Sequence, residues 1–355
     1  MSSEVIIYSS LFPSDTQPVK GLFVSELAKA LTHHIDVKVV KPVFLNQNHF
    51  SAFRETKKYK YAQTVEVNPS FCFNIPRFFK WTDSFLTAWF SSKAFNHSVT
   101  KNTKLVHAHF AYPDAAAALR LCLKQALPLV VTVHGSDINV LAKDLDRRKI
   151  IVNTLNQADA VICVSEELIQ KIRRIGVVNQ QIYHIPNGVD IEYFTPGNKD
   201  LAKRKIGAKQ VKKLLLTVGN LVPIKGYDNL IRALSLLPEE IGLVMAGSGP
   251  EQESLKKLIQ QLGLEGRIKF AGAVEHNALP VYYQAADFLI ISSHSEGWPT
   301  VIFESFACGV PVIANNVGGV SEAVSSYQLG VLMDHNEPKN IADSILTAYS
   351  RCWDN

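Results

Sequence analysis

Short apolar runs rich in β-branched residues alternate with helical patterns from one end of this chain to the other. Neighbouring parallel strands need a long crossover, usually a helix, so this alternation predicts parallel sheets with helices on both faces. A chain of 355 residues is too long for one ordinary core and suits two domains. The expected fold class is α/β, with two doubly wound, Rossmann-like domains facing a central cleft at the carboxyl ends of their strands.

The expected elements are spread over both halves. Strands are predicted at Val5–Ser9, Ile35–Val40, Leu105–Ala108, Leu129–His134, Ala160–Val164, Ile182–Ile185, Leu214–Val218, Leu243–Ala246, Ile268–Ala271, Phe288–Ser292, Val312–Ala314 and Val331–Met333. Helices are predicted at Leu22–Leu31 and Ala115–Leu123, and near 227–236, 251–262, 279–285, 300–308 and 338–349. The polar, lysine-rich stretch 196–213 is interpreted as the connection between domains 1–195 and 196–355.

Composition indicates a soluble globular protein, with 47% hydrophobic and 19% charged residues. The apolar runs fall short of a membrane span, and the N-terminus lacks the basic start of a signal peptide. We therefore expect a cytoplasmic protein, at the inner membrane surface if it contacts lipid. The cysteines are isolated, which is typical of reduced thiols. They are Cys72, Cys122, Cys163, Cys308 and Cys352.

Charge is uneven along the chain. Residues 1–195 hold 22 Lys and Arg against 16 Asp and Glu, net +6, whereas residues 196–355 hold 15 against 16, net −1. A basic first half favours an anionic acceptor or an anionic membrane, although ordinary solvated surface explains it equally well. Within Phe71–Phe90, bases and aromatics mix in a way that suits a membrane or a lipid-linked acceptor, or else a core helix with its loop. These residues are Arg77, Phe78, Phe79, Lys80, Trp81 and Trp89.

The segment 293–322 gives the strongest indication of function. A loop carrying Glu296 and Gly297 follows an apolar strand and leads into a helix at 300–308 whose only charge is Glu304. A buried carboxylate needs a hydrogen-bonding partner, and ligand hydroxyls would supply one. The helix start at Thr300 and Val301 offers backbone amides to an anion. Two carboxylates around an anion site suit a polyol–phosphate–polyol ligand, the shape of a sugar nucleotide.

These residues carry a family resemblance. The chain has Glu296 and Glu304 separated by seven residues, followed by Gly309–Ala314 and Gly318–Glu322. This pattern resembles the nucleotide-sugar signature of the retaining GT-B glycosyltransferases of family 4. The resemblance implies a nucleoside diphosphate sugar as substrate, a glycan or lipid-linked hydroxyl acceptor, and neither a metal nor a cofactor. It also implies Glu304 on the ribose and Glu296 on the sugar. The alternative is a structural helix whose Glu304 is satisfied internally.

Two further loops of the second half extend the resemblance. Gly219–Gly226 resembles the loop whose Arg and Lys bind the donor pyrophosphate; here Lys225 matches, and Asn220 stands where Arg is usual. Gly247–Pro250 is not a dinucleotide fingerprint and resembles a loop near the donor. The segment ending at Val274 resembles the one whose backbone reads the nucleobase, so no side chain there specifies which base is bound.

In the first half, His134 is expected at the end of a buried strand, facing the cleft; the alternative is a histidine satisfied by the backbone. The resemblance implies that His134 lies beside the transferred sugar as a catalytic residue, as does Glu296, with Asp137 on the acceptor side. Gly21 remains from the paired glycines of the family's N-terminal loop, which the resemblance places near the donor phosphate or the acceptor. Similar N-termini occur among enzymes that make cell-surface polysaccharides of the teichuronic-acid type. His107-Ala-His109 lacks a third metal ligand in sequence, so we reject a metal site. Asp144-Leu-Asp146 is interpreted as part of a surface helix.

Other functions are compatible with this architecture. An epimerase would convert the sugar nucleotide without an acceptor, and a non-catalytic binding module would bind it without transfer. A dehydrogenase is disfavoured because the glycine fingerprint is absent, and no motif points to nucleic acid. Family members normally end in a long helix that crosses back to the first domain; here the sequence ends at 351–355, where we expect that helix to be short or missing.

Overall fold

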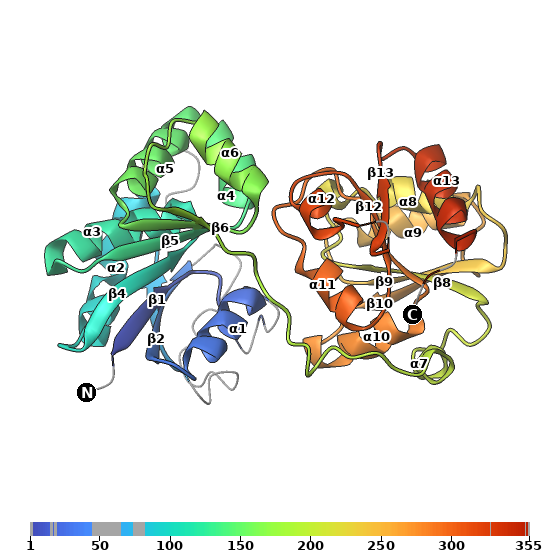
Figure 1. Ribbon diagram of the computed structural model, residues 1–355, viewed down its shortest axis with the longest axis horizontal. Helices are drawn as coiled ribbons and strands as arrows, with labels where there is room; N and C mark the ends of the chain where they lie inside the picture. The colour runs from blue at the N-terminus through green and yellow to red at the C-terminus, as the bar shows by residue number, and fades with distance from the viewer. Residues whose placement is uncertain are drawn as a thin grey trace. The chain divides into compact units, whose positions relative to one another are not determined.

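The computed structural model describes residues 3–14, 17, 20–44, 65–73, 82–326, 328–351 and 353. The chain forms two compact units, Met1–Pro186 and Asn187–Asn355, so the division precedes the boundary after residue 195 that the sequence suggests. In each unit the described strands form one parallel sheet (Figure 1). The predicted α/β fold is confirmed.

The described residues of the first unit form a seven-stranded sheet in the order β3-β2-β1-β4-β5-β6-β7. Successive residues of a strand serve its two faces: Ile7 packs beneath the first helix, whereas the Tyr8 hydroxyl lies 2.6 Å from Ser91 Oγ on the other face. The strands are β1 (Glu4–Tyr8), β2 (Asp36–Phe44), β3 (Glu66–Cys72), β4 (Thr103–His109), β5 (Leu129–Val133), β6 (Ala160–Cys163) and β7 (Ile182–His184). The α-helices are α1 (Leu22–Leu31), α2 (Asp83–Ser98), α3 (Ala116–Gln125), α4 (Ser136–Asn139), α5 (Leu145–Gln157) and α6 (Glu166–Arg174).

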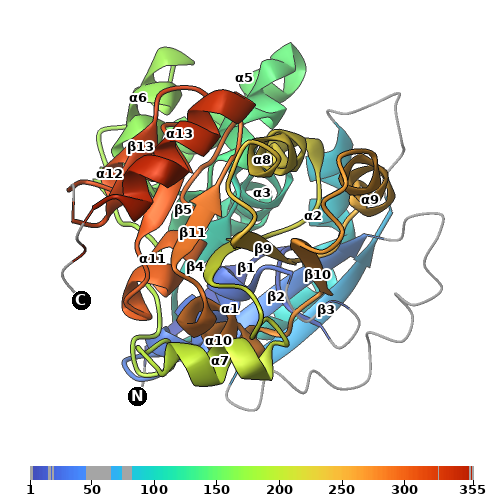
Figure 2. The same cartoon turned by 90° about the vertical axis from the view of Figure 1, so that its right-hand side faces the viewer.

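The second unit has a six-stranded sheet in the order β10-β9-β8-β11-β12-β13 among its described residues. One apolar cluster joins the sheet to α8, α9 and α13, and a second joins its other face to α7, α10, α11 and α12 (Figure 2). The strands are β8 (Lys213–Val218), β9 (Ile241–Ala246), β10 (Ile268–Gly272), β11 (Phe288–Ile291), β12 (Val312–Asn315) and β13 (Gly330–Met333). The α-helices are α7 (Lys199–Lys205), α8 (Tyr227–Leu234), α9 (Gln252–Gln261), α10 (Leu279–Ala285), α11 (Thr300–Ala307), α12 (Val320–Ala323) and α13 (Pro338–Tyr349).

Every predicted strand is present, and β3 is a further strand that the apolar pattern did not predict. In that strand Asn68 and Pro69 interrupt the apolar pattern, yet it pairs in parallel with β2 at the edge of the sheet, where proline is tolerated. The interpretation of 196–213 as an interdomain connection is wrong. Its helix α7 packs on α10, and Ala202 and Ile206 are buried in the second unit's core.

Four further expectations concern the cysteines, the aromatic–basic segment, a membrane span and Asp144–Asp146. The four cysteines in the described part of the chain are buried free thiols, and Cys352 lies outside that part. Residues 74–81 of the aromatic–basic segment, which include Arg77, Phe78, Phe79, Lys80 and Trp81, are also outside the described residues. No helix among those described is both long and apolar enough to cross a membrane. Asp144 caps α5 by accepting a hydrogen bond from the Arg147 amide at 3.2 Å, which confirms the surface-helix interpretation of Asp144–Asp146.

Candidate functional site

The candidate site of the second unit lies at the carboxyl edge of its sheet, next to the point where the strand order reverses. Strand β8 lies between β9 and β11, so the loops that leave β8 and β11 flank this switch point. Parallel α/β sheets bind ligands at such points. Lys225 follows β8 and Glu296 follows β11. The two loops are joined by hydrogen bonds from the His294 amide to Ile224 O at 2.8 Å and from Ser292 Oγ to Lys225 O at 2.9 Å.

Lys225 and Glu296 contact each other directly. Lys225 Nζ donates to Glu296 Oε1 at 2.6 Å, and Ser293 Oγ donates to the same oxygen at 2.6 Å. The two side chains are 25% and 12% exposed, so the pairing offsets part of the desolvation of each charge. The sequence pattern predicted a ligand role for both residues and no bond between them. The structure adds this bond, so each charged side chain is the other's partner.

Glu304 lies on the second turn of α11 and is 8% exposed. Its Oε2 accepts a hydrogen bond from the buried Tyr283 hydroxyl of α10 at 2.6 Å, and its Oε1 lies 3.8 Å from His276 Nε2. Burial and the nearby carboxylate raise the pKa of Tyr283 well above its usual range, so the phenol stays a donor. One carboxylate oxygen is thus held by the protein, and the other has only the distant His276 beside it among the described residues.

The start of α11 has no side-chain cap. Pro299 stands at the cap position and has no side-chain acceptor, and the first intrahelical bond there is donated by the Ile302 amide to Pro299 O at 3.0 Å. Within the described part of the chain, no acceptor bonds to the backbone amides of Thr300 and Val301. Free amides at the positive end of a helix dipole are an anion-binding arrangement.

Close backbone approaches explain the glycines around this site. Gly318 has φ +60°, and a Cβ there would lie 2.0 Å from the carbonyl oxygen of Glu296. The Gly319 amide donates to Gly297 O at 3.1 Å, so the glycine turn after β12 supports the Glu296 loop. Gly247 has φ +158° and a Cβ there would lie 1.8 Å from Gly219 O, so this glycine packs the loop after β9 against the loop that contains Asn220.

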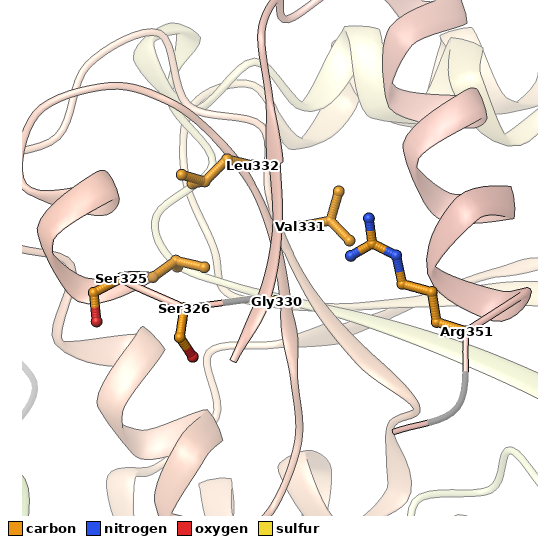
Figure 3. Close-up of a pocket in the computed structure, with 7 residues that line it drawn as sticks. Ser325, Ser326, Gly330, Val331, Leu332 and Arg351 are labelled. Carbon is orange, nitrogen blue, oxygen red and sulfur yellow. The ribbon is translucent and has the colours of Figure 1, made fainter. Parts of the chain in front are cut away.

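The remaining predicted residues of this unit lie at the same edge. Asn220 is exposed, in the loop after β8. Val274 follows β10 and is partly buried against the core. A cavity of about 270 Å³ in this unit is not part of the site, since it lies at the amino end of β13 (Figure 3). It is lined by Val324, Ser325, Ser326, Gly330, Val331, Leu332 and Arg351.

In the first unit, three histidines gather at the carboxyl ends of β4 and β5. His109 Nδ1 lies 3.0 Å from His134 Nε2, and the two ring centroids are 5.2 Å apart with 22° between the ring planes. The His134 ring also contacts Phe23 and Phe110, with centroids 4.6 and 4.7 Å away. His107 Nε2 lies 2.7 Å from Thr132 Oγ1. No metal-binding group of three or more His, Cys, Asp or Glu exists among the described residues.

Asp137 lies beneath the loop that follows β5. It is fully buried, and its carboxylate accepts hydrogen bonds from the amides of Ala111 and Gly135, each at 2.9 Å, and from that of His134 at 3.3 Å. These contacts hold His134 in place. The predicted acceptor-side contact is not supported, because no oxygen of Asp137 faces solvent.

Gly21 precedes α1 with φ +69°, and a Cβ there would lie 2.1 Å from Leu11 O. A left-handed backbone and a close approach therefore account for this glycine. Asp114, which the sequence analysis missed, links the loop after β1 to the loop after β4. Its Oδ2 accepts from the Ser10 amide at 2.7 Å and from Ser10 Oγ at 2.8 Å. Burial raises the pKa of Asp114 to about 7.

Two family models match consecutive parts of the chain. "Glycosyltransferase Family 4" matches residues 21–193, and "Glycosyl transferases group 1" matches residues 198–351. The chain is a family 4 glycosyltransferase. The first match includes His109, His134 and Asp137, the second includes Lys225, Glu296 and Glu304, and together they reach into both units of the enzyme.

Curated relatives agree with this assignment. The glycosyltransferase is 28% identical over 350 residues to TuaC of Bacillus subtilis (strain 168), named for teichuronic acid biosynthesis, covering 92% of this chain and 84% of TuaC. It is 27% identical over 260 residues to N-acetyl-alpha-D-glucosaminyl L-malate synthase of Bacillus anthracis, covering 72% and 68%.

Solved structures share the GT-B fold of this glycosyltransferase. HepE of Anabaena, solved in complex with UDP and glucose, has a TM-score of 0.75 at 23% identity, covering 98% of this chain and 90% of HepE. Sucrose-phosphate synthase of Thermosynechococcus elongatus has a TM-score of 0.79 at 22% identity, covering 99% and 90%. At these identities the likeness concerns the fold.

Proposed function

We propose that this glycosyltransferase transfers a sugar, with retention and without a metal, from a nucleoside diphosphate sugar to a hydroxyl acceptor. One observation carries the proposal. Glu304, a carboxylate with one oxygen held by the protein, lies on the helix whose first amides have no acceptor among the described residues. This helix is beside the two loops that carry the paired Lys225 and Glu296. A ribose, a pyrophosphate and a sugar present hydroxyls, negative charge and hydroxyls in the matching order.

Each residue then has a chemical task. Glu304 accepts from the ribose hydroxyls, while Lys225 and the amides of Thr300 and Val301 bind the pyrophosphate. Lys225 has three N–H donors, so it can keep its bond to Glu296 and still donate to a phosphate oxygen. Glu296 accepts from hydroxyls of the transferred sugar, and His134 donates to that sugar.

The bond changes follow a front-face route. The anomeric carbon–phosphate oxygen bond breaks as the acceptor oxygen bonds to the same carbon on the same face. The acceptor proton passes to the departing phosphate oxygen. In this route the enzyme contributes mainly positioning and stabilisation of the leaving group. By the names of its relatives, the acceptor belongs to polysaccharide or glycolipid synthesis.

The donor class is tested by thermal unfolding in the presence of UDP-, GDP- and ADP-sugars. We expect one nucleotide to stabilise the protein by about 2.7 kcal/mol at a concentration 100 times its Kd. Conversion of the sugar nucleotide without an acceptor would indicate an epimerase. Binding without transfer to any hydroxyl acceptor would indicate a binding module, and stabilisation by none of the three would contradict a nucleotide-sugar donor.

We also propose peripheral contact of the first unit with an anionic membrane, through a surface that we call the α2–α3 face. Large apolar side chains on this face are exposed: Phe85 by 54%, Trp89 by 64% and Leu123 by 67%. Exposed apolar groups beside cations are typical of surfaces that contact a bilayer interface. The face consists of Phe85, Trp89, Lys93, Arg120, Leu123 and Lys124.

The exposed charges of the segment around this face are all positive. All lysines and arginines between residues 82 and 126 are exposed, whereas both acids of the segment are withdrawn from solvent. Asp114 is fully buried, and Asp83 Oδ2 accepts from the Tyr112 hydroxyl at 3.3 Å. The guanidinium of Arg120 lies 5.9 Å from the Phe85 ring centroid, so a cation stands directly beside an exposed aromatic. The exposed bases are Lys93, Lys101, Lys104, Arg120 and Lys124.

Vesicle flotation tests this contact. We expect the protein to float with equimolar phosphatidylcholine–phosphatidylglycerol vesicles and not with pure phosphatidylcholine. Each cation near such a surface contributes about 1 kcal/mol, so Lys93→Glu with Lys124→Glu should weaken binding at least about 30-fold. Phe85→Ser with Trp89→Ser should also weaken it.

Lys209→Glu with Lys257→Glu is the matched control, because both lysines are exposed in the second unit. This control should leave flotation unchanged. Loss of binding in the control to the same extent as in the α2–α3 variants, or no flotation of the wild type, would contradict the assigned face.

A further inference from the structure

His134 has its Nε2 edge against a second histidine. His109 Nδ1 is 3.0 Å from His134 Nε2, a distance at which one nitrogen must donate and the other accept. The Nδ1 edge of His134 has no hydrogen-bond partner among the described residues and is not among their buried unpartnered atoms. Its ring plane is fixed by Phe23 and Phe110. The orientation of the His134 ring is therefore set, and the open question is which of its two nitrogens carries the proton.

Both imidazoles are neutral near pH 7. Burial lowers the pKa of His134 to about 3 and holds the pKa of His109 well below its usual range. Each ring therefore carries one N–H, and the pair shares a single hydrogen bond. The proton on His109 must lie either on Nδ1, toward His134, or on Nε2.

The surroundings of His109 distinguish these two arrangements. His109 is 1% exposed, and its Nε2 is buried without a hydrogen-bond partner in the described part of the chain. A proton on Nε2 would leave a buried N–H with no acceptor, whereas a proton on Nδ1 leaves only an unused lone pair. Buried N–H groups without acceptors are the rarer and costlier case. His109 therefore donates through Nδ1.

We infer that His109 is a positioning residue that donates its Nδ1–H to His134 Nε2 and so keeps the proton of His134 on Nδ1. The free edge of His134 is then a hydrogen-bond donor and not a base. This inference rests on the proposed function in one respect: that function supplies the group that His134 faces, an oxygen of the transferred sugar. A fixed donor suits a sugar hydroxyl or a developing negative charge, and leaves proton removal from the acceptor to the departing phosphate.

Ring ¹⁵N NMR on the unliganded protein reads this tautomer without any substrate. We expect the His134 signals, assigned by their loss in His134→Gln, to show a protonated Nδ1 and a bare Nε2 at neutral pH. In His109→Leu the donor to Nε2 is gone, so the Nε2–H form should appear. His107→Leu is the matched control, because His107 is on the same strand but bonds to Thr132 Oγ1 at 2.7 Å. It should leave the His134 tautomer unchanged.

Activity gives a second measurement. His109→Leu should lower the transfer rate about 10- to 100-fold, as loss of a group that orients a histidine typically does, with little change in Kd for the nucleotide. A wild-type His134 protonated on Nε2, or a tautomer shift of equal size in His107→Leu, would overturn the inference. If the tautomer is as expected but no sugar is transferred, the proposed function fails and His109 still sets the proton position.

Discussion

Replacing Glu304 with alanine is expected to abolish measurable donor binding while the second unit stays folded. The carboxylate is 8% exposed and would accept two charge-assisted hydrogen bonds from a ribose. Losing these bonds should cost about 3 kcal/mol or more, which is at least a 100-fold increase in Kd. Titration calorimetry with the stabilising nucleotide measures the affinity, and circular dichroism verifies the fold.

Tyr283→Phe separates a ligand-binding role of Glu304 from a structural one. Both variants break the same 2.6 Å hydrogen bond, and Glu304→Ala leaves the buried Tyr283 hydroxyl without an acceptor, at about 1–3 kcal/mol of stability. Only Glu304→Ala removes the carboxylate. If both variants lose stability and both bind nucleotide like the wild type, Glu304 serves the core alone. The exposed Glu265 provides a surface control as Glu265→Ala.

Lys225→Ala is expected to lower kcat by about 10²- to 10³-fold, the usual result of removing one group that stabilises charge in the transition state. Lys225 is the single base of the loop Gly219–Gly226, since Asn220 is neutral. Its removal also leaves Glu296 without the cation that lies 2.6 Å away, so the carboxylate would repel the phosphates. Steady-state kinetics with the identified donor measures the change, and Lys209→Ala is the exposed control.

A double-mutant cycle shows whether the Lys225–Glu296 pair acts as a unit. Because the two residues touch, their effects should not add: in the double variant Lys225→Ala with Glu296→Gln, the repulsion is removed and nucleotide affinity should recover relative to Lys225→Ala. Sugar transfer should stay low, since Glu296 would no longer bind sugar hydroxyls as a carboxylate. Additive effects, or wild-type kcat in Lys225→Ala, would contradict the proposed roles.

Much of the fold could be predicted because its rules are local. The spacing of apolar residues predicted α1, α10 and α13 with the bounds that the structure shows, and every predicted strand is present. The errors have physical causes. β3 contains Asn68 and Pro69 and depends on its partner β2. The stretch 196–213 looks like a linker because its lysines are numerous, yet Ala202 and Ile206 anchor it in the core.

The candidate site was predicted in its residue types and not in its contacts. The pattern of Glu296 and Glu304 around a helix start indicated a sugar nucleotide, and the family matches confirm a glycosyltransferase. Nothing in the sequence showed that Tyr283 holds Glu304, that Ser293 and Lys225 share one oxygen of Glu296, or that Asp137 is buried beneath His134. In the sequence pattern, Tyr283 is simply another apolar position of its helix, so the pattern gives no sign of its hydrogen bond.

The sequence by itself determined the alternation of strands and helices, the glycine turns and the residues placed after each strand, because these depend on neighbours a few positions away. The tertiary structure decided which of those residues meet. Lys225 and Glu296 are 71 positions apart, and His109 and His134 are 25 apart. They meet because parallel strands bring all their carboxyl ends to one edge of a sheet, and strand order, which no local pattern encodes, selects the neighbours there.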